Sequence, residues 1–220
     1  MNELNTLELE QVFSFRGAIY QLLARFYRQE VDRELLDQLH LLQFDADATM
    51  PEVMDGNQLL KVYLNRAGEN ALTELAVDYA KIFLGAGPTL GDGAYPYESV
   101  YTSPDRLLMQ EARDQAVAIY ASEGIEPEGD FNEPEDHISI ELSFMAFLCQ
   151  KTVEAIRRND EAAVNSYLKK QLQYLQDHLI PWVPMFCADI VRLATTDFYK
   201  AISKITYGFL IMDRDVLGQT

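Results

Sequence analysis

Cysteine is scarce in this 220-residue chain, which contains only Cys149 and Cys187. Each lies in an apolar run, so we expect buried thiols rather than a disulfide. No stretch approaches the roughly 18 uninterrupted apolar residues that a membrane-spanning helix requires. The opening residues, MNELNTLELEQVF, carry acidic residues where a secretory signal would carry basic ones. These absences predict a cytoplasmic protein without stable membrane insertion.

Basic residues are also few: 18 lysines and arginines stand against 35 aspartates and glutamates, giving a formal net charge of −17. Such a surface repels the phosphates of nucleic acids and anionic lipids, so neither is predicted as a partner. It attracts basic partners and speeds their encounter. The charge therefore agrees with a basic ligand, although it is explained equally well by solubility alone.

Apolar residues recur at spacings of three, four and seven through most of the chain, as Leu9, Phe13, Tyr20 and Tyr27 illustrate. We find no convincing alternating strand and no internal repeat. The predicted fold class is therefore all-α, a compact bundle of about nine to ten helices. The segment from Ile138 to Cys149 is apolar on more than one face, which predicts a helix at the centre of the core.

Some helix ends are predicted from breaking residues. Residues 45–56 are polar and contain Pro51, which indicates a loop. A helix over 57–66 and another over 69–84 should follow. Gly85 is expected to end the second of these, because glycine favours the left-handed conformation found after many helices.

Other helix starts are predicted from capping patterns. The pair Ser103-Pro104 is typical of a helix start, and this helix should run to Ser122. Asn132 and Glu135 have the spacing of a capping box. The proline between them suits a first turn, so a helix is expected to begin near residue 134.

Two segments should interrupt the helices. Residues 85–103, GAGPTLGDGAYPYESVYTS, form a long glycine- and tyrosine-rich loop, and such loops in compact domains are often functional. Residues 124–132 form an acidic hinge that joins N-terminal helices (1–123) to C-terminal helices (133–220) in one domain, 1–220. A hinge of this kind permits exchange of the C-terminal helices, so we expect a monomer or a domain-swapped dimer.

Neither a nucleotide cradle nor a catalytic metal centre is favoured by the motifs. The run GAGPTLGDG follows a helix and lacks the lysine of a phosphate-binding loop, so a flexible connection is the better interpretation. His137 and Glu141 are four residues apart and make half of a possible metal site, but no second pair accompanies them. No nucleophile motif is present.

A peptide site fits the polar residues better. Glu98, Glu133, Asp136 and His137 could form an acidic rim beside the tyrosine-rich loop. Carboxylates bind guanidinium groups in a bidentate manner, and tyrosines offer apolar faces and cation–π contacts. Such a site suits a peptide with arginines next to an apolar run. We expect the loop and the helix start near residue 134 to form one groove.

Four short segments match, in order and spacing, the motifs of one known family. They are Tyr79-x-x-x-Phe83-Leu84-Gly85; Pro96-Tyr97-Glu98-Ser99-Val100-Tyr101; Glu133-Pro134-Glu135-Asp136-His137 followed by Glu141-Leu142; and His178-Leu179 with Trp182, Pro184 and Phe186. With these motifs the sequence resembles the TorD/DmsD-type redox enzyme maturation chaperones, to which the NarJ-type assembly proteins are related. The third motif is the most specific.

The resemblance implies an all-helical cytoplasmic chaperone rather than an enzyme. Its partners would be the twin-arginine signal peptide and the apo-form of a molybdopterin-containing oxidoreductase, which it would hold until cofactor insertion and before export. No resident cofactor is implied, although some members of the family bind guanine nucleotide weakly. A NarJ-type chaperone of a redox subunit that is not exported is the alternative. A metal-dependent hydrolase using Asp136, His137 and Glu141 is a more distant one.

The resemblance also implies which residues contact the peptide. Carried onto this sequence, and with Glu133 added from the acidic rim, the predicted peptide-binding residues are Tyr79, Phe83, Pro96, Tyr97, Glu98, Tyr101, Glu133, Asp136 and His137. Tyr97 departs from the family, which often has tryptophan there. The change preserves an aromatic contact but alters which leader is preferred.

Overall fold

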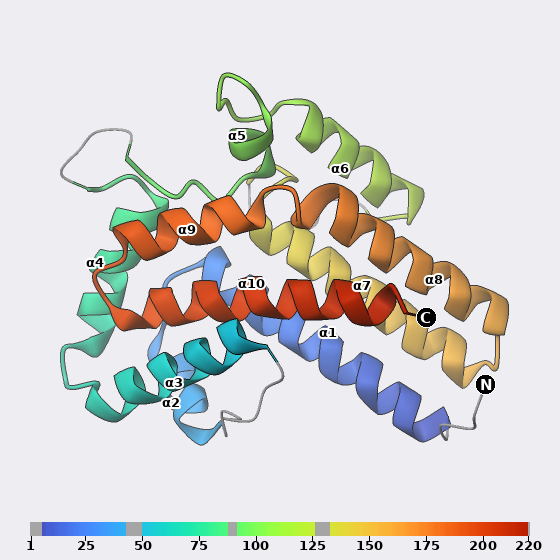
Figure 1. The fold of residues 1–220 in the computed structure, drawn as a ribbon, viewed down its shortest axis with the longest axis horizontal. Helices are drawn as coiled ribbons and strands as arrows, with labels where there is room; N and C mark the ends of the chain where they lie inside the picture. The colour runs from blue at the N-terminus through green and yellow to red at the C-terminus, as the bar shows by residue number, and fades with distance from the viewer. Residues whose placement is uncertain (1–5, 43–49, 88–91, 126–132, 220) are drawn as a thin grey trace. The chain divides into compact units, whose positions relative to one another are not determined.

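The computed structural model describes residues 6–42, 50–87, 92–125 and 133–219. Within these ranges the chain forms ten α-helices and one π-helical turn and no named strand, which confirms the predicted all-α fold. No helix in the described ranges is long and apolar enough to cross a membrane. In chain order the elements are α1 (Thr6–Arg28), α2 (Arg33–Leu41), α3 (Pro51–Arg66), α4 (Ala71–Phe83), α5 (Glu98–Thr102), α6 (Glu111–Ser122), α7 (Ile138–Arg157), α8 (Glu161–Tyr174), η1 (Leu175–Leu179), α9 (Val183–Leu193) and α10 (Asp197–Leu217) (Figure 1).

These elements divide into two compact units, each assembled from separate parts of the chain. The first unit combines Met1–Arg25, Tyr97–Pro181 and Arg214–Thr220. The second unit combines Phe26–Pro96 and Trp182–Asp213. Each unit has buried apolar residues of its own.

The core of the first unit lies between α1, α7 and α8. Phe13 of α1 packs with Val153 and Ile156 of α7, and partly buried apolar residues of α8 cover this cluster. In Figure 1, α7 and α8 run side by side. Thirteen residues of α7 are buried, on more than one side of the helix, as expected for a central helix.

The core of the second unit is rich in aromatic rings and contains one buried carboxylate. Asp78 of α4 is 2 % exposed. It accepts hydrogen bonds from the backbone N–H groups of Thr195 (2.9 Å) and Thr196 (2.8 Å) and from the Thr196 hydroxyl (2.7 Å). The carboxylate thereby joins α4 to the start of α10. Gly85, with φ of 67°, follows the end of α4, which confirms the predicted stop.

The two cysteines are buried thiols, one in each unit, as expected. Burial raises the pKa of the Cys187 thiol, so little reactive thiolate is present near neutral pH.

The third helix begins earlier than the sequence predicts. We expected Pro51 to lie within a loop over 45–56, whereas α3 starts at Pro51. Proline fits this position because the N–H groups of the first turn have no partner inside the helix. Residues 45–49 of the predicted loop lie outside the described residues.

The segment around Ser103-Pro104 also differs from the prediction, because it does not start a helix. Residues 103–110 form turns, with Arg106 and Met109 at positive φ values of 53° and 57°, and α6 begins only afterwards. The predicted long loop over 85–103 also contains the short helix α5. The backbone N–H of Gln110 donates to the Ser99 hydroxyl of α5 at 3.1 Å, and this tertiary contact competes with the local helix-start pattern.

The start of α7 lies four residues beyond the predicted one. Its N-cap is His137, whose Nδ1 accepts a hydrogen bond from the backbone N–H of Ser139 at 3.1 Å. Asn132, the expected capping residue, lies outside the described residues, as does the part of the predicted hinge over 126–132. Exchange of C-terminal helices in a dimer therefore stays a prediction.

Candidate functional site

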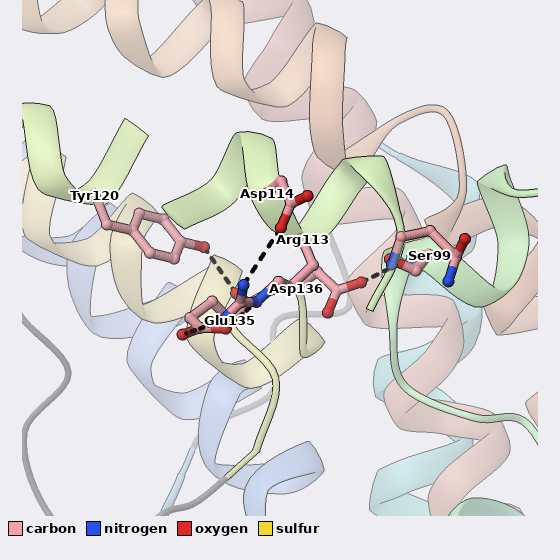
Figure 2. Close-up of polar contacts among 7 residues, drawn as sticks. Ser99, Arg113, Asp114, Tyr120, Glu135 and Asp136 are labelled. Atoms are coloured by element: carbon pink, nitrogen blue, oxygen red, sulfur yellow. Dashed lines mark hydrogen bonds and ion pairs between the residues drawn. The ribbon is translucent and has the colours of Figure 1, made fainter. Parts of the chain in front are cut away.

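The third motif of the sequence, residues 133–137, lies along the start of α5 in the first unit. Tyr97 and His137 form an isolated antiparallel bridge. The backbone N–H of Glu98 donates to the carbonyl of Asp136 at 3.0 Å, and the N–H of Ser99 donates to its Oδ2 at 2.9 Å (Figure 2). Asp136 thus serves as the cap that α5 lacks locally, because Tyr97 makes no side-chain cap. The tyrosine-rich loop and the segment before α7 therefore meet at Tyr97 and His137, while a groove formed by the two stays a prediction.

Tyr97 lies between a histidine and an exposed acid. Its ring meets the His137 ring edge to face, with centroids 5.1 Å apart and planes at 77°. Its hydroxyl donates to Glu133 Oε2 at 2.6 Å. Tyr97 is half-buried and Glu133 is exposed, so both side chains have surface in contact with solvent.

Glu135 is held by an arginine from α6. Arg113 donates from Nε to Oε2 at 2.6 Å and from Nη2 to Oε1 at 3.0 Å, a bidentate pair (Figure 2). The hydrogen bond to Glu135 raises the pKa of Arg113. The hydroxyl of Tyr120, also on α6, donates to the carbonyl of Glu135 at 3.2 Å. Together these contacts fix the segment before α7 against α6.

A second polar group lies in the interior of the first unit. His178 of η1 has its Nδ1 3.0 Å from Glu98 Oε2, and its ring stacks on Tyr174 with centroids 4.7 Å apart. Glu141 of α7 joins this pair, so that one ligating atom from each of Glu98, Glu141 and His178 lies within 4.8 Å of the others. All three residues are buried.

The structure changes the interpretation of the acidic rim. Asp136 and Glu98 are 0 % and 3 % exposed, so their carboxylates do not line the surface. They are buried because one caps α5 and the other pairs with His178. Of the three predicted rim acids, Glu133 alone is exposed.

The aromatic residues carried over from the family are divided between the two units. Tyr101 is half-buried in the first unit, with the Arg106 guanidinium 5.5 Å from its ring centroid. Tyr79, Phe83 and Pro96 belong to the second unit and are buried there. The structure therefore brings together Tyr97, Glu98, Glu133, Asp136 and His137, and a groove shared with the other aromatic residues stays a prediction.

Sequence reasoning did not place Arg113, Tyr120, Glu141 or His178 in this arrangement. Each acts through a partner distant in the sequence, as Arg113 does with Glu135 and His178 with Glu98. Glu141 carried one signal, its position four residues after His137 in a motif. That spacing suggested half of a metal site shared with His137, whereas the ligating group found among the described residues combines Glu141 with Glu98 and His178.

The Arg113–Glu135 pair offers a test of how firmly the segment is held. A double-mutant cycle with Arg113→Gln and Glu135→Gln should give a coupling free energy of about 0.5–1 kcal/mol, because both side chains keep partial solvent contact. The measurement is the free energy of unfolding in urea at low and high salt. Asp114→Asn is the control, since this neighbour of Arg113 is exposed and should contribute little. A coupling free energy indistinguishable from zero at low salt would mean that the pair does not stabilise the segment.

The chain is similar in sequence to known proteins over most of its length. The family model described as nitrate reductase delta subunit matches residues 46–188. Among curated proteins, the chaperone protein TorD of Aliivibrio salmonicida is 30% identical over 219 residues, covering 97% of each chain. The chaperone protein TorD of Vibrio cholerae is 27% identical, covering 96% of each chain, and that of Vibrio vulnificus is 29% identical, covering 92% of this chain and 94% of the relative.

Proposed function

The chain belongs to the family of TorD chaperones, which are not enzymes, and on that premise we propose that it binds the twin-arginine signal peptide of a molybdopterin-containing oxidoreductase. It holds the apoenzyme in the cytoplasm until the cofactor is inserted, and it thereby delays export. The observation that carries this proposal is the hydrogen-bonded pair of exposed Glu133 and half-buried Tyr97, with the His137 ring packed against that of the tyrosine.

An arginine of the peptide would be recognised by Glu133. This carboxylate is exposed and accepts one hydrogen bond, from the Tyr97 hydroxyl. A guanidinium group can offer two parallel N–H donors to the same carboxylate, which is a stronger interaction than a single neutral hydrogen bond. The net charge of −17 would also raise the rate at which a basic peptide encounters this face.

Asp136 and Glu98 would act behind this surface rather than contact the arginines. Both are buried, and both fix the start of α5, from which Tyr97 projects. A binding face made of one tyrosine and one glutamate needs such support, because a side chain on an unsupported segment loses conformational freedom when the ligand binds.

The apolar run of the peptide would cover aromatic side chains. Tyr97 and Tyr101 are half-buried and so have ring surface to offer. The family resemblance also implies Tyr79, Phe83 and Pro96, but these residues are buried in the second unit and offer little surface to a peptide. Burial of apolar surface contributes roughly 25 cal/mol per Å² before the cost of ordering the peptide is subtracted.

A synthetic peptide with two adjacent arginines followed by an apolar run tests the proposal by calorimetry. We expect its affinity to fall with salt without vanishing, because screening weakens ion pairs but not apolar contacts. Changing both arginines to glutamate should weaken binding by roughly tenfold or more at low salt, equivalent to about 1.4 kcal/mol per factor of ten. Equal affinity for both peptides would rule out recognition of the arginines.

The position of the recognising acid is tested with two matched variants. Glu133→Gln should lose most of the preference for the twin-arginine peptide. Glu34→Gln removes the same charge from an exposed site on α2 and should preserve it. If both variants lose the preference equally, the recognition comes from the overall charge and not from Glu133.

One alternative has an observation in its favour. The matching family model describes a nitrate reductase subunit, which supports a NarJ-type role for a redox subunit that stays in the cytoplasm. A peptide without adjacent arginines, taken from the start of such a subunit, would then bind more tightly than the twin-arginine peptide. Capture of the client from the native organism identifies which of the two proteins is served.

A further inference from the structure

Three buried side chains with metal-ligating groups meet in the first unit. Glu98 opens α5, Glu141 lies in the first turn of α7, and His178 lies in η1. They are 3 %, 0 % and 4 % exposed, and one ligating atom from each lies within 4.8 Å of the others. The proposed function makes no use of this convergence beyond the support that Glu98 gives to α5.

Charged groups buried in a protein interior are normally paired or coordinate a metal ion, because removing them from water is costly. Two carboxylates and one imidazole are groups that divalent transition metals accept as ligands.

The negative charge also reaches the neighbouring tyrosines. Burial, and then the charge of Glu141 together with that of Glu98, raises the pKa of Tyr120. Burial, then the charge of Tyr120 and then that of Glu141, raises the pKa of Tyr174, whose hydroxyl lies 2.8 Å from that of Tyr120.

The donor set points to a particular class of cation. Imidazole with two carboxylates suits Zn²⁺ and similar divalent transition metals better than Mg²⁺, which prefers oxygen ligands and retains several waters. Ligands bonded tetrahedrally to Zn²⁺ lie about 3.3–3.5 Å apart. His178 Nδ1 and Glu98 Oε2 are already 3.0 Å apart, so small rotations of three side chains would bring the donors into place. We propose that Glu98, Glu141 and His178 form a structural binding site for a divalent transition-metal ion of the Zn²⁺ class.

Such an ion would cross-link three segments of the first unit. It would join the start of α5, the start of α7 and the π-helical turn, which are distant in the sequence. The stacking of His178 on Tyr174 fixes the plane of the imidazole, as neighbours of metal-ligating histidines commonly do. The expected consequence is higher stability of the first unit, since a ligand that binds the folded state alone stabilises it.

Thermal unfolding of the full-length protein without a histidine tag tests the site. After dialysis against a chelator, ZnCl₂ at about one hundred times its dissociation constant should raise the Tm of the wild type by about 5–10 °C. Elemental analysis after gel filtration should find about one Zn²⁺ per chain. MgCl₂ at the same concentration should raise the Tm much less.

Matched variants separate this site from adventitious binding to the acidic surface. Glu141→Gln and His178→Gln should abolish the rise in Tm, while His40→Gln, which removes an exposed histidine of α2, should retain it. No rise in the wild type overturns the proposal. A rise that persists in Glu141→Gln and His178→Gln also overturns it, since the ion would then bind elsewhere.

A second readout does not depend on how well the variants fold. Co²⁺ in place of Zn²⁺ should give visible absorption bands of a nitrogen- and oxygen-ligated site in the wild type, and stoichiometric Zn²⁺ should displace them. A Co²⁺ spectrum identical to that of the hydrated ion would overturn the proposal whatever the variants show.

Discussion

Replacing Asp136 with alanine should lower the free energy of unfolding by about 2–3 kcal/mol and weaken binding of the twin-arginine peptide at least tenfold. The side chain is 0 % exposed, and its Oδ2 is the acceptor for the backbone N–H of Ser99 at 2.9 Å. Alanine removes that acceptor and leaves the N–H buried without it. A hydrogen bond to a charged group contributes about 1.5–3 kcal/mol, which sets the expected loss.

The effect on binding follows from the length of α5. This helix has only five residues, Glu98–Thr102, and a helix so short does not form without tertiary support. Tyr97 immediately precedes it and carries the proposed contact with the peptide. Loss of the cap should therefore release the tyrosine from its position beside His137 and Glu133.

Urea unfolding and calorimetry of two variants separate positioning from direct contact. Asp136→Asn retains an oxygen acceptor and should recover much of the stability and of the affinity lost in Asp136→Ala. Asp136→Ala that is as stable as the wild type but does not bind would mean that the carboxylate contacts the peptide itself. In that case the assignment of Asp136 as a buried cap would be wrong.

The helices could be predicted from the sequence because apolar spacing reports which side of a helix is buried. The spacing of Leu9, Phe13 and the apolar residues after them predicted α1. The segment from Ile138, which is apolar on more than one face, predicted the central helix α7. Helix starts were harder to predict, because serine, proline and acidic residues occur both at helix starts and in turns. Pro51 opens a helix where a break was expected, and Ser103-Pro104 lies in turns where a start was expected.

The acidic residues at 133–136 could be identified as a candidate site from the sequence, but their hydrogen-bond partners could not be predicted. A capping box accounts for acidic residues near a helix start, and that interpretation uses local spacing alone. In the structure, Glu133 accepts from Tyr97, Glu135 pairs with Arg113, and Asp136 caps α5. These partners are between 22 and 37 residues away in the sequence, a separation at which spacing carries no information.

Replacing Phe83 with alanine should have the largest effect on stability, a loss of about 3–5 kcal/mol in the free energy of unfolding. The family resemblance assigns Phe83 to the peptide site, but the side chain is only 3 % exposed in the second unit. Its ring centroid lies 4.9 Å from that of Tyr79, 5.7 Å from that of Tyr199 and 5.9 Å from that of Tyr27. The phenyl ring therefore fills the middle of an aromatic cluster, and alanine would leave a cavity there.

Two further variants distinguish a core role from a ligand contact. Leu84→Ala changes the adjacent residue, which is 65 % exposed, and should alter stability by less than about 0.5 kcal/mol. Phe83→Leu keeps most of the apolar volume and should cost less than about 1.5 kcal/mol. Urea unfolding gives the stabilities, and calorimetry with the twin-arginine peptide gives the affinities.

These stabilities and affinities together distinguish a core role for Phe83 from a direct contact with the peptide. If Phe83 is a core residue, affinity should follow stability, so that Phe83→Leu binds the peptide nearly as well as the wild type. If the ring contacts the peptide, Phe83→Leu should lose affinity while it remains stable. A Phe83→Ala variant as stable as the wild type would contradict the packing described here, because a ring with three aromatic neighbours within 6 Å cannot be removed from a close-packed core without cost.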